Sequence, residues 1–245
     1  MPRRDLRFLL LQARNPGDRV REEERRQFAA RMKVDPRQVQ TRCLLTETLD
    51  ASIFDQTDML LVGGSGEYSV TEPHPGVERA KVFLALVAQQ GFPTFASCFG
   101  FQLLVEGMGG KVEPKKESAE VGTYHLELTE HGQADPVFSS LGPRFTAQLG
   151  HKDHATVLPS GVDNLARSVL CENQALRVHD KPVYAAQFHP ELNWTDNRGR
   201  FERYFDHYAH AFGEVEARRM LEEDFFPSPQ ASALLDRFIE QTFAR

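Results

Sequence analysis

The stretch from Pro93 to Gly110 constrains the fold of this chain more than any other. A short apolar segment runs from Pro93 to Ala96, and a helical pattern starts near Phe99 and ends among glycines at positions 107, 109 and 110. The sequence therefore predicts a strand that passes through one sharp turn into a helix, with Cys98 at the turn.

Cys98 lies where a thiol gains reactivity. A sharp turn lifts the side chain clear of a sheet, and the positive end of the helix dipole favours the thiolate, which is the reactive form. The free N–H groups of the first helical turn can bind a developing oxyanion. A lone cysteine is often only a buried core thiol, but a cysteine between strand and helix is a candidate nucleophile.

A histidine that completes such a nucleophile follows at position 189, in the segment 184–191. In extended backbone, residues two apart point to the same side, and Pro190 restricts His189 to extended angles. The carboxylate of Glu191 can therefore orient the imidazole while the other ring nitrogen faces a thiol. The alternative is a core or surface histidine; the neighbouring Pro190 and Glu191 favour the triad Cys98, His189 and Glu191.

Three motifs together resemble the class I glutamine amidotransferases that carry a Cys-His-Glu triad. They are Cys-x-Gly-x-Gln at 98–102, His-Pro-Glu at 189–191, and the apolar run 59–62 that ends in the paired glycines 63–64. Within the family the chain is most similar to the glutaminase domain of GMP synthases. The resemblance covers about residues 5–192, and the three motifs occur in the expected order.

The resemblance implies an α/β fold of the flavodoxin-like type, with a mostly parallel central sheet flanked by helices and with extra C-terminal helices. Residues 1–245 are expected to form one amidotransferase-like domain, with a core at about 5–192 and a helical extension at about 195–245. The residue patterns also indicate buried strands that alternate with helices. Expected strands lie at 6–12, 38–45, 58–62, 110–116, 120–129, 145–149, 166–170, 175–178 and 183–188, and expected helices at 21–32 and 76–90.

The helical extension carries aromatic residues at helical spacing. This spacing predicts one apolar face that packs against the domain, and a partner or dimer surface is the alternative. Ser228, between two prolines, is expected to cap a final helix that carries Leu234 and Phe238. The aromatic residues are Phe201, Tyr204, Phe205, Tyr208 and Phe212.

The resemblance also implies roles for residues around the triad. The N–H groups of Gly64 and Phe99 would form the oxyanion hole, and Gln102 would help hold the glutamine substrate. His151 and Asp153 would line the amino-acid pocket beside the nucleophile. Because His154 follows, a metal site is the alternative there, but the spacing lacks the helical register or cysteine pairs of familiar zinc sites. Glu120 would border the site.

Three positions depart from the family pattern. Ala96 stands where glycine usually lies two residues before the cysteine, so a methyl group is expected to crowd the turn slightly. Ser65 replaces a proline that often follows the paired glycines, so the loop is expected to be shaped differently. Phe101 replaces a frequent histidine and is expected to pack in the core.

Composition limits the partners of the chain. The net charge of −6 gives no general affinity for nucleic acid, and no apolar run approaches the ~20 residues of a membrane span. Three cysteines, Cys43, Cys98 and Cys171, indicate reduced thiols in a cytoplasmic compartment, with Cys43 a small buried hydrophobe. The mixed charges of 19–26 predict a solvated helix face.

The resemblance implies a reaction at the γ-glutamyl amide of glutamine. Cys98 would form a thioester and release glutamate and ammonia, without a metal or an organic cofactor. Partners would be a synthetase that takes the ammonia, or a second copy in a homodimer. A stand-alone γ-glutamyl peptide hydrolase is the first alternative, and a non-catalytic binding scaffold is the second. The intact triad argues against a scaffold.

Overall fold

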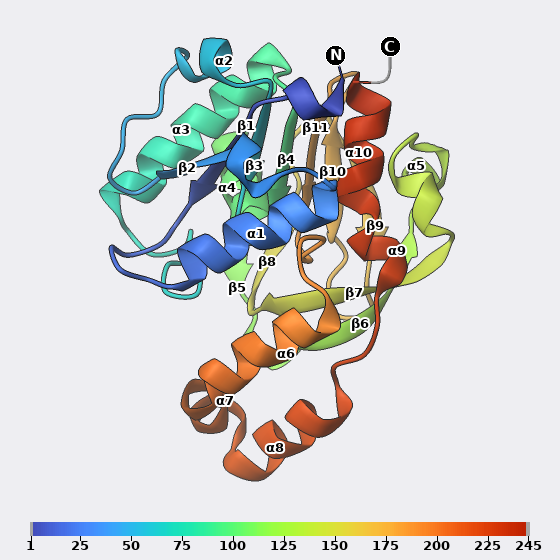
Figure 1. The fold of residues 1–245 in the computed structure, drawn as a ribbon. Coiled ribbons are helices and arrows are strands. Elements are labelled where there is room, and N and C mark those ends of the chain that lie inside the picture. The colour runs from blue at the N-terminus through green and yellow to red at the C-terminus, as the bar shows by residue number, and fades with distance from the viewer. Residues whose placement is uncertain (1, 244–245) are drawn as a thin grey trace.

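A nine-stranded sheet forms the centre of the computed structural model, which describes residues 2–243 and, at residue 207, the backbone alone (Figure 1). The strand order is β2-β1-β3-β4-β11-β10-β9-β6-β7. The first five strands are parallel to one another, and the other four are joined by antiparallel pairing. The parallel strands are β2 (Val39–Cys43), β1 (Phe8–Gln12), β3 (Met59–Val62), β4 (Thr94–Ser97) and β11 (Val183–Ala186).

The antiparallel strands extend the sheet beyond β11. They are β10 (Ala175–Val178), β9 (Val162–Arg167), β6 (Glu120–Leu128) and β7 (Arg144–His151). A separate two-stranded sheet pairs β5 (Lys111–Pro114) with β8 (Asp153–Val157). The predicted α/β fold, with a parallel central sheet flanked by helices, is confirmed.

The central strands are apolar throughout because both faces of the sheet are covered. Alternate side chains of a strand point to opposite faces. Leu10 and Leu61 therefore belong to one core cluster, and Leu9 and Leu60 belong to another. This double burial explains the continuous apolar runs that indicate parallel strands in the sequence.

Helices cover each face of the sheet. On one face lie α1 (Val20–Met32) and α10 (Leu234–Phe243), and on the other lie α3 (Pro75–Gln90) and α4 (Phe99–Gly107) (Figure 1). The end of α3 is the predicted one, because Gly91 takes the left-handed conformation with φ 65° that closes the last helical turn. The short helices are α2 (Ile53–Gln56) and α5 (Glu130–Ala134).

One predicted strand near the antiparallel half is misplaced, and one strand was not predicted. The strand expected at 166–170 is β9, which ends at Arg167, because Ser168 and Cys171 close a turn through the bond from Ser168 N–H to Cys171 O (2.8 Å). Val169 at the turn is almost fully exposed. Strand β8 was not predicted at all, because its polar start at Asp153 resembles a loop in the sequence.

The predicted aromatic face is built from two helices instead of one. Helix α6 (Trp194–Arg203) ends at Tyr204, and α7 (Phe205–Phe212) and α8 (Glu214–Glu223) follow. We call α6–α8 the C-terminal arm; it lies beside β6 and β7 in Figure 1. Its small core contains Phe201, Met220 and Phe225, with the Phe201 and Tyr208 rings stacked 4.2 Å apart.

After the arm, the chain returns to the central sheet. Asp224 O accepts the Thr123 N–H of β6 at 2.7 Å, and α9 (Pro229–Ser232) leads into α10. Ser228 precedes α9, but its hydroxyl makes no helix-capping bond and accepts from Gln148 Nε2 at 2.9 Å, so the predicted cap is wrong. In α10, the Phe238 ring packs on the Phe95 ring of β4 at 5.7 Å.

Two further features concern the described part of the chain. None of its helices has the length and apolar character needed to cross a membrane. Cys43, Cys98 and Cys171 are free thiols, and all three are buried. Cys43 is therefore the small buried residue that the sequence predicts.

Candidate active site

Cys98 occupies a strained turn between β4 and α4. Its backbone has φ 51° and ψ −103°, a conformation that residues other than glycine rarely adopt and that costs about 1–3 kcal/mol. Gly100 permits the tight packing that follows, because a Cβ there would lie 2.8 Å from Val62 Cβ. Ala96 pairs with Val62 and Ala185 inside the sheet, so its methyl group does not prevent the turn.

His189 and Glu191 follow β11, the strand beside β4. The His189 N–H donates to Gln148 O at 2.9 Å, which fixes the backbone where the ring begins. His189 Nδ1 and Glu191 Oε1 are 2.6 Å apart, and both side chains are buried. The spacing of two around Pro190 therefore produces the predicted imidazole–carboxylate pair.

The electrostatics of this pair favour a protonated imidazole. Burial lowers the pKa of His189, but the charges of Glu191 and of a Cys98 thiolate raise it more, to about 10. Burial also raises the pKa of Glu191, but the charge of His189 and their hydrogen bond hold it below its ordinary value. A histidine that carries a proton beside a cysteine can support a thiolate and deliver a proton to a leaving group.

Gly64 brings the nucleophile and the histidine together from the adjacent strand, β3. A Cβ on Gly64 would lie 2.8 Å from His189 Cε1 and 3.7 Å from Cys98 Cβ. Only a residue without a side chain fits this position. Among the hydrogen bonds of residues 2–243, none has the N–H of Gly64 or Phe99 as its donor, so both remain available to a ligand.

Ser65 shapes the loop after Gly64 differently from a proline. Its hydroxyl accepts the Tyr68 N–H at 2.9 Å and closes a turn. The loop then reaches across to β8, where Ser69 Oγ donates to Asp153 Oδ2 at 2.7 Å. Ser65 therefore closes this turn with a side-chain hydrogen bond that a proline ring could not accept.

The three residues predicted to bind substrate form one buried group. Gln102 Nε2 donates to Asp153 O at 3.0 Å, and His151 Nδ1 lies 3.1 Å from the same oxygen. Gln102 belongs to the first turn of α4, since its N–H donates to Cys98 O at 3.1 Å. Phe101 is fully buried in the core, as predicted.

Glu120 supports this group from β6. Its Oε2 lies 3.0 Å from His151 Nε2 and accepts from Gln174 Nε2 at 2.6 Å. Gln187 accepts from Gln102 Nε2 at 3.1 Å. Neither glutamine was predicted as a site residue; Gln187 precedes His189 by two residues, the spacing that puts both on one side of an extended segment. Buried atoms without a protein partner here are Glu120 Oε1, Asp153 Oδ1, Gln174 Oε1 and Gln187 Nε2.

The histidines of this region are engaged with protein groups. His154 Nε2 lies 3.1 Å from Ser118 O, and burial followed by the charge of His151 lowers the pKa of His154. Within residues 2–243, no group of three or more His, Cys, Asp and Glu side chains could hold a metal ion.

Helix α1 supplies a buried charge that sequence analysis missed. The run 19–26 was expected to be a solvated face, but Val20 and Glu24 are buried. Their side chains point inward because α1 covers the sheet with this face. Glu24 lies against Gly63, where a Cβ would be 2.7 Å from its carboxylate oxygen. One acidic residue of the charged run 19–26, Glu24, is therefore buried beneath the glycine loop.

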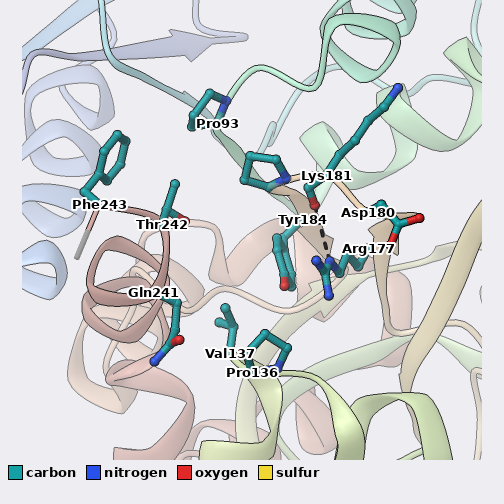
Figure 2. A pocket seen from close by; sticks show the side chains of 11 residues that line it. Pro93, Pro136, Val137, Arg177, Asp180, Lys181, Tyr184, Gln241, Thr242 and Phe243 are labelled. Carbon is teal, nitrogen blue, oxygen red and sulfur yellow. Dashed lines mark hydrogen bonds between the residues drawn. The ribbon is translucent and has the colours of Figure 1, made fainter. Parts of the chain in front are cut away.

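A cavity lies at the other end of the strands from Cys98. Its volume is about 590 Å³, and Pro93 and Lys181, which precede β4 and β11, help to line it (Figure 2). Arg177 and Tyr184 also face it, and both bond to Asp135, at 3.3 Å and 2.9 Å. The catalytic candidates and the cavity therefore occupy opposite edges of the sheet.

A family model described as glutamine amidotransferase class-I matches residues 22–206. The chain belongs to this family. The match includes Cys98, His189 and Glu191 but ends within the C-terminal arm. Because the family consists of glutamine amidotransferases, the chain is placed among enzymes.

Two curated relatives support membership in this amidotransferase family. One is a component of the glutamine-hydrolysing GMP synthase from Methanothermobacter thermautotrophicus; it is 35% identical over 162 residues, which span 66% of this chain and 80% of the relative. The corresponding component from Methanosarcina barkeri is 30% identical over 151 residues, or 62% of this chain and 73% of the relative. The resemblance to GMP synthase glutaminases is confirmed.

The fold of this amidotransferase is also that of solved structures. A glutamine amidotransferase from Thermotoga maritima superposes with a TM-score of 0.70 and 18% identity, over 96% of this chain and 97% of that chain. At this identity the likeness concerns the fold. The likeness spans nearly the whole chain.

Proposed function

We propose that this amidotransferase is a glutaminase that hydrolyses the γ-carboxamide of glutamine through a thioester on Cys98. The supporting observation is the convergence of Cys98, Gly64 and the His189–Glu191 pair at one edge of the sheet. A strained nucleophile, an oriented base and unpaired backbone donors are the three parts that acyl transfer needs.

In the first half of the reaction, the Cys98 thiolate attacks the amide carbon. The carbonyl oxygen becomes an oxyanion that accepts the N–H groups of Gly64 and Phe99. His189 then gives its proton to the nitrogen, the C–N bond breaks, and ammonia leaves. Glu191 stabilises the imidazolium before the transfer and holds its orientation afterwards.

In the second half, His189 takes a proton from water, which attacks the thioester carbon. The C–S bond breaks, Cys98 leaves as the thiolate and glutamate is released; because His189 keeps the proton from water, the starting thiolate–imidazolium pair is restored. Gln102, His151 and Asp153 hold the amino-acid end of the substrate, with Glu120 fixing His151. The unpartnered atoms Asp153 Oδ1 and Gln187 Nε2 are available for its polar groups.

The ammonia passes to a separate synthetase protein in this proposal. The support is the names of the relatives, which are individual subunits of glutamine-hydrolysing GMP synthases. Three free, buried cysteines are compatible with a reducing, cytoplasmic compartment.

The proposal is tested by following glutamate and ammonia release by the purified chain. Glutamine and a panel of γ-glutamyl dipeptides serve as substrates, and Cys98→Ala serves as the control. Glutamine turnover that is lost in the variant supports a glutaminase, and an increase on adding the synthetase component of a GMP synthase supports the partner.

Two outcomes would contradict the proposed glutaminase. Rapid cleavage of a dipeptide without any partner assigns a stand-alone γ-glutamyl peptide hydrolase. If no substrate is cleaved and Cys98 also resists a glutamine-like alkylating agent, the chain is a binding scaffold and the proposed reaction is wrong.

A further inference from the structure

A buried polar cluster lies beneath the loop that presents Gly64. It consists of Gln12 at the end of β1, Arg14 just beyond it, and Glu24 on α1, and we call it the Glu24 cluster. Their exposed fractions are 0%, 6% and 0%. Glu24 accepts from Gln12 Nε2 at 2.8 Å and from Arg14 Nη2 at 3.2 Å. Gln12 Nε2 also donates to Arg21 O at 2.9 Å.

The cluster contacts the loop on both sides of Gly64. At Gly63, a Cβ would lie 2.7 Å and 3.0 Å from the two Glu24 carboxylate oxygens. At Gly66, a Cβ would lie 3.7 Å from Arg14 Nη1. Gly64, between these two contacts, lies against His189 and Cys98 on its other side. The loop is therefore held between the cluster and the catalytic candidates.

Stability alone does not account for these buried charges. A buried Arg–Glu pair is usually no more stabilising than apolar residues of similar volume, because both ions lose hydration. Within the described residues, Gln12 Oε1 and Arg14 Nε also lack a hydrogen-bond partner, which adds to the cost. Close packing against a hydrogen-bonded cluster does, however, restrict a glycine-rich loop that has few side chains to fix its conformation.

The charges in the cluster must balance. A lone Glu24 carboxylate beside Gly63 would oppose the negative charge that develops on the substrate oxygen near Gly64. Burial lowers the pKa of Arg14, but Glu24 first, and then Asp18 and Tyr204, more than offset this and keep it above its ordinary value, so Arg14 remains a cation. Arg14 therefore offsets the charge of Glu24 beneath the loop, and its Nη1 also lies 3.9 Å from Asp18 Oδ2.

We propose that Gln12, Arg14 and Glu24 are positioning residues that hold the Gly63–Gly66 loop where the Gly64 N–H meets the oxyanion. The inference rests on the proposed amide hydrolysis. These residues act through the loop and do not touch the reacting atoms. Their effect is on the transition state, so they raise kcat without changing the binding of substrate.

Helix α1 also holds the C-terminal arm, and this contact provides a matched control. Glu23, next to Glu24, forms a two-bond ion pair with Arg203 of α6, with both distances 3.0 Å. This pair is partly exposed and joins α1 to the arm instead of to the loop. Replacing either Arg–Glu pair by the same apolar residues makes the same chemical change in two places.

The test compares Arg14→Met/Glu24→Leu with Glu23→Leu/Arg203→Met. Two rates are measured in the full chain: glutamine hydrolysis, which needs an oxyanion hole, and alkylation of Cys98 by iodoacetamide, which forms no tetrahedral oxyanion. We expect the first variant to lose about 10–100-fold in kcat, with KM and the alkylation rate within about twofold of wild type. The second variant keeps all three values within about twofold.

Several outcomes overturn the inference. Unchanged kcat in the Arg14→Met/Glu24→Leu variant does so, as does a parallel loss of alkylation, which indicates general damage to the site. If that variant fails to fold, Gln12→Leu, which keeps the ion pair, must lower kcat several-fold without slowing alkylation, or the inference fails. Wild-type protein that is alkylated but cleaves no amide refutes the proposed function itself, and the positioning role falls with it.

Discussion

The two ends of the parallel strands differ in the pairing of their polar groups and in the space around them. At the carboxyl edge, Cys98 is strained, His189 and Glu191 are buried, and several buried polar atoms lack protein partners. At the amino edge, an open cavity of about 590 Å³ is lined by prolines and by Arg177, which is paired with Asp135 (Figure 2). Both edges are built from β4 and β11.

The cavity and the candidate catalytic residues therefore lie at opposite ends of the same strands. At the amino edge, the Arg177 cation is paired with the Asp135 carboxylate. The carboxyl edge has strain, a raised histidine pKa and free backbone donors, which are features that function selects and stability does not. The following experiments test whether activity depends on one edge alone.

The largest expected effect is at the nucleophile. Cys98→Ala should lower glutamine hydrolysis on the order of 10⁶-fold, because a methyl group cannot form the thioester. The thermal midpoint should change little, since the small residue fits the same turn. Ammonia release and thermal unfolding measure the two quantities. Retention of more than about 1% of the activity would contradict the role of Cys98 and the assignment of activity to the carboxyl edge.

The next effect is at the orienting carboxylate. Glu191→Gln should lower kcat about 10⁴-fold, because the amide no longer stabilises the imidazolium of His189. The Nδ1 contact of 2.6 Å is replaced by a neutral hydrogen bond, so the pKa of His189 should fall. NMR titration of the His189 ring and steady-state kinetics measure both changes. An unchanged pKa of His189 would show that Glu191 does not stabilise the protonated imidazole.

Gly64→Ala should have a smaller effect, about 10²–10³-fold on kcat, because the new Cβ displaces the imidazole or the oxyanion donor. The added atom would lie 2.8 Å from His189 Cε1. The matched control is Gly199→Ala in α6, where a Cβ meets nothing within 4 Å. That change should leave kcat unaltered and stabilise the arm by about 0.5–1 kcal/mol. Equal kinetic effects in the two variants would contradict the role of Gly64.

The raised pKa of His189 predicts a pH-dependent stability. The Cys98→Ala variant isolates the contribution of Glu191, because only Glu191 then stabilises the proton on His189. The folded state binds a proton that the unfolded state releases above about pH 6.5, so the unfolding free energy falls as the pH rises, by about 1.4 kcal/mol per unit, until the folded-state pKa is passed. Urea unfolding from pH 6 to 10 measures the slope. It should vanish in Cys98→Ala/Glu191→Gln, and a slope that persists there has another origin.

The smallest effect on activity is expected at the amino edge. Arg177→Met removes the cation 3.3 Å from Asp135, which keeps its bond from Tyr184. The unfolding free energy should fall by about 1–3 kcal/mol because the buried carboxylate loses its counter-charge. The kcat for glutamine should stay within about twofold of wild type. A large loss of kcat would show that the two edges act together.

Much of the fold was predictable because its pattern is local. The run 59–62 and the paired glycines after it indicate a buried strand and a close approach, and the structure has both at β3 and Gly64. Gly91 ends α3 as expected. The strand that begins at Val162 was misplaced because its first half, 162–164, is mostly polar and only partly buried, and so lacks the apolar pattern of a central strand. The break at Tyr204 was missed because the aromatic spacing continues through it.

The candidate site was predictable where a motif fixes its geometry. His189, Pro190 and Glu191 are adjacent in sequence, and their distances follow from backbone rules. Glu24 was not predictable, because its burial depends on which face of α1 meets the sheet. Gln174 was equally hidden, since its contact with Glu120 joins residues that are far apart in the chain.

The packing of α10 on β4 also determines when the core around β4 can be completed during synthesis. Phe95, three residues before Cys98, lies under Phe238, and the translated chain reaches that residue only long after the nucleophile. At about 5–20 residues per second, the strand that carries the reactive thiol waits for seconds with one face uncovered. A nascent chain that stalls before α10 therefore exposes both an apolar strand face and a thiol. Docking of α10 covers this face and lowers the risk of aggregation.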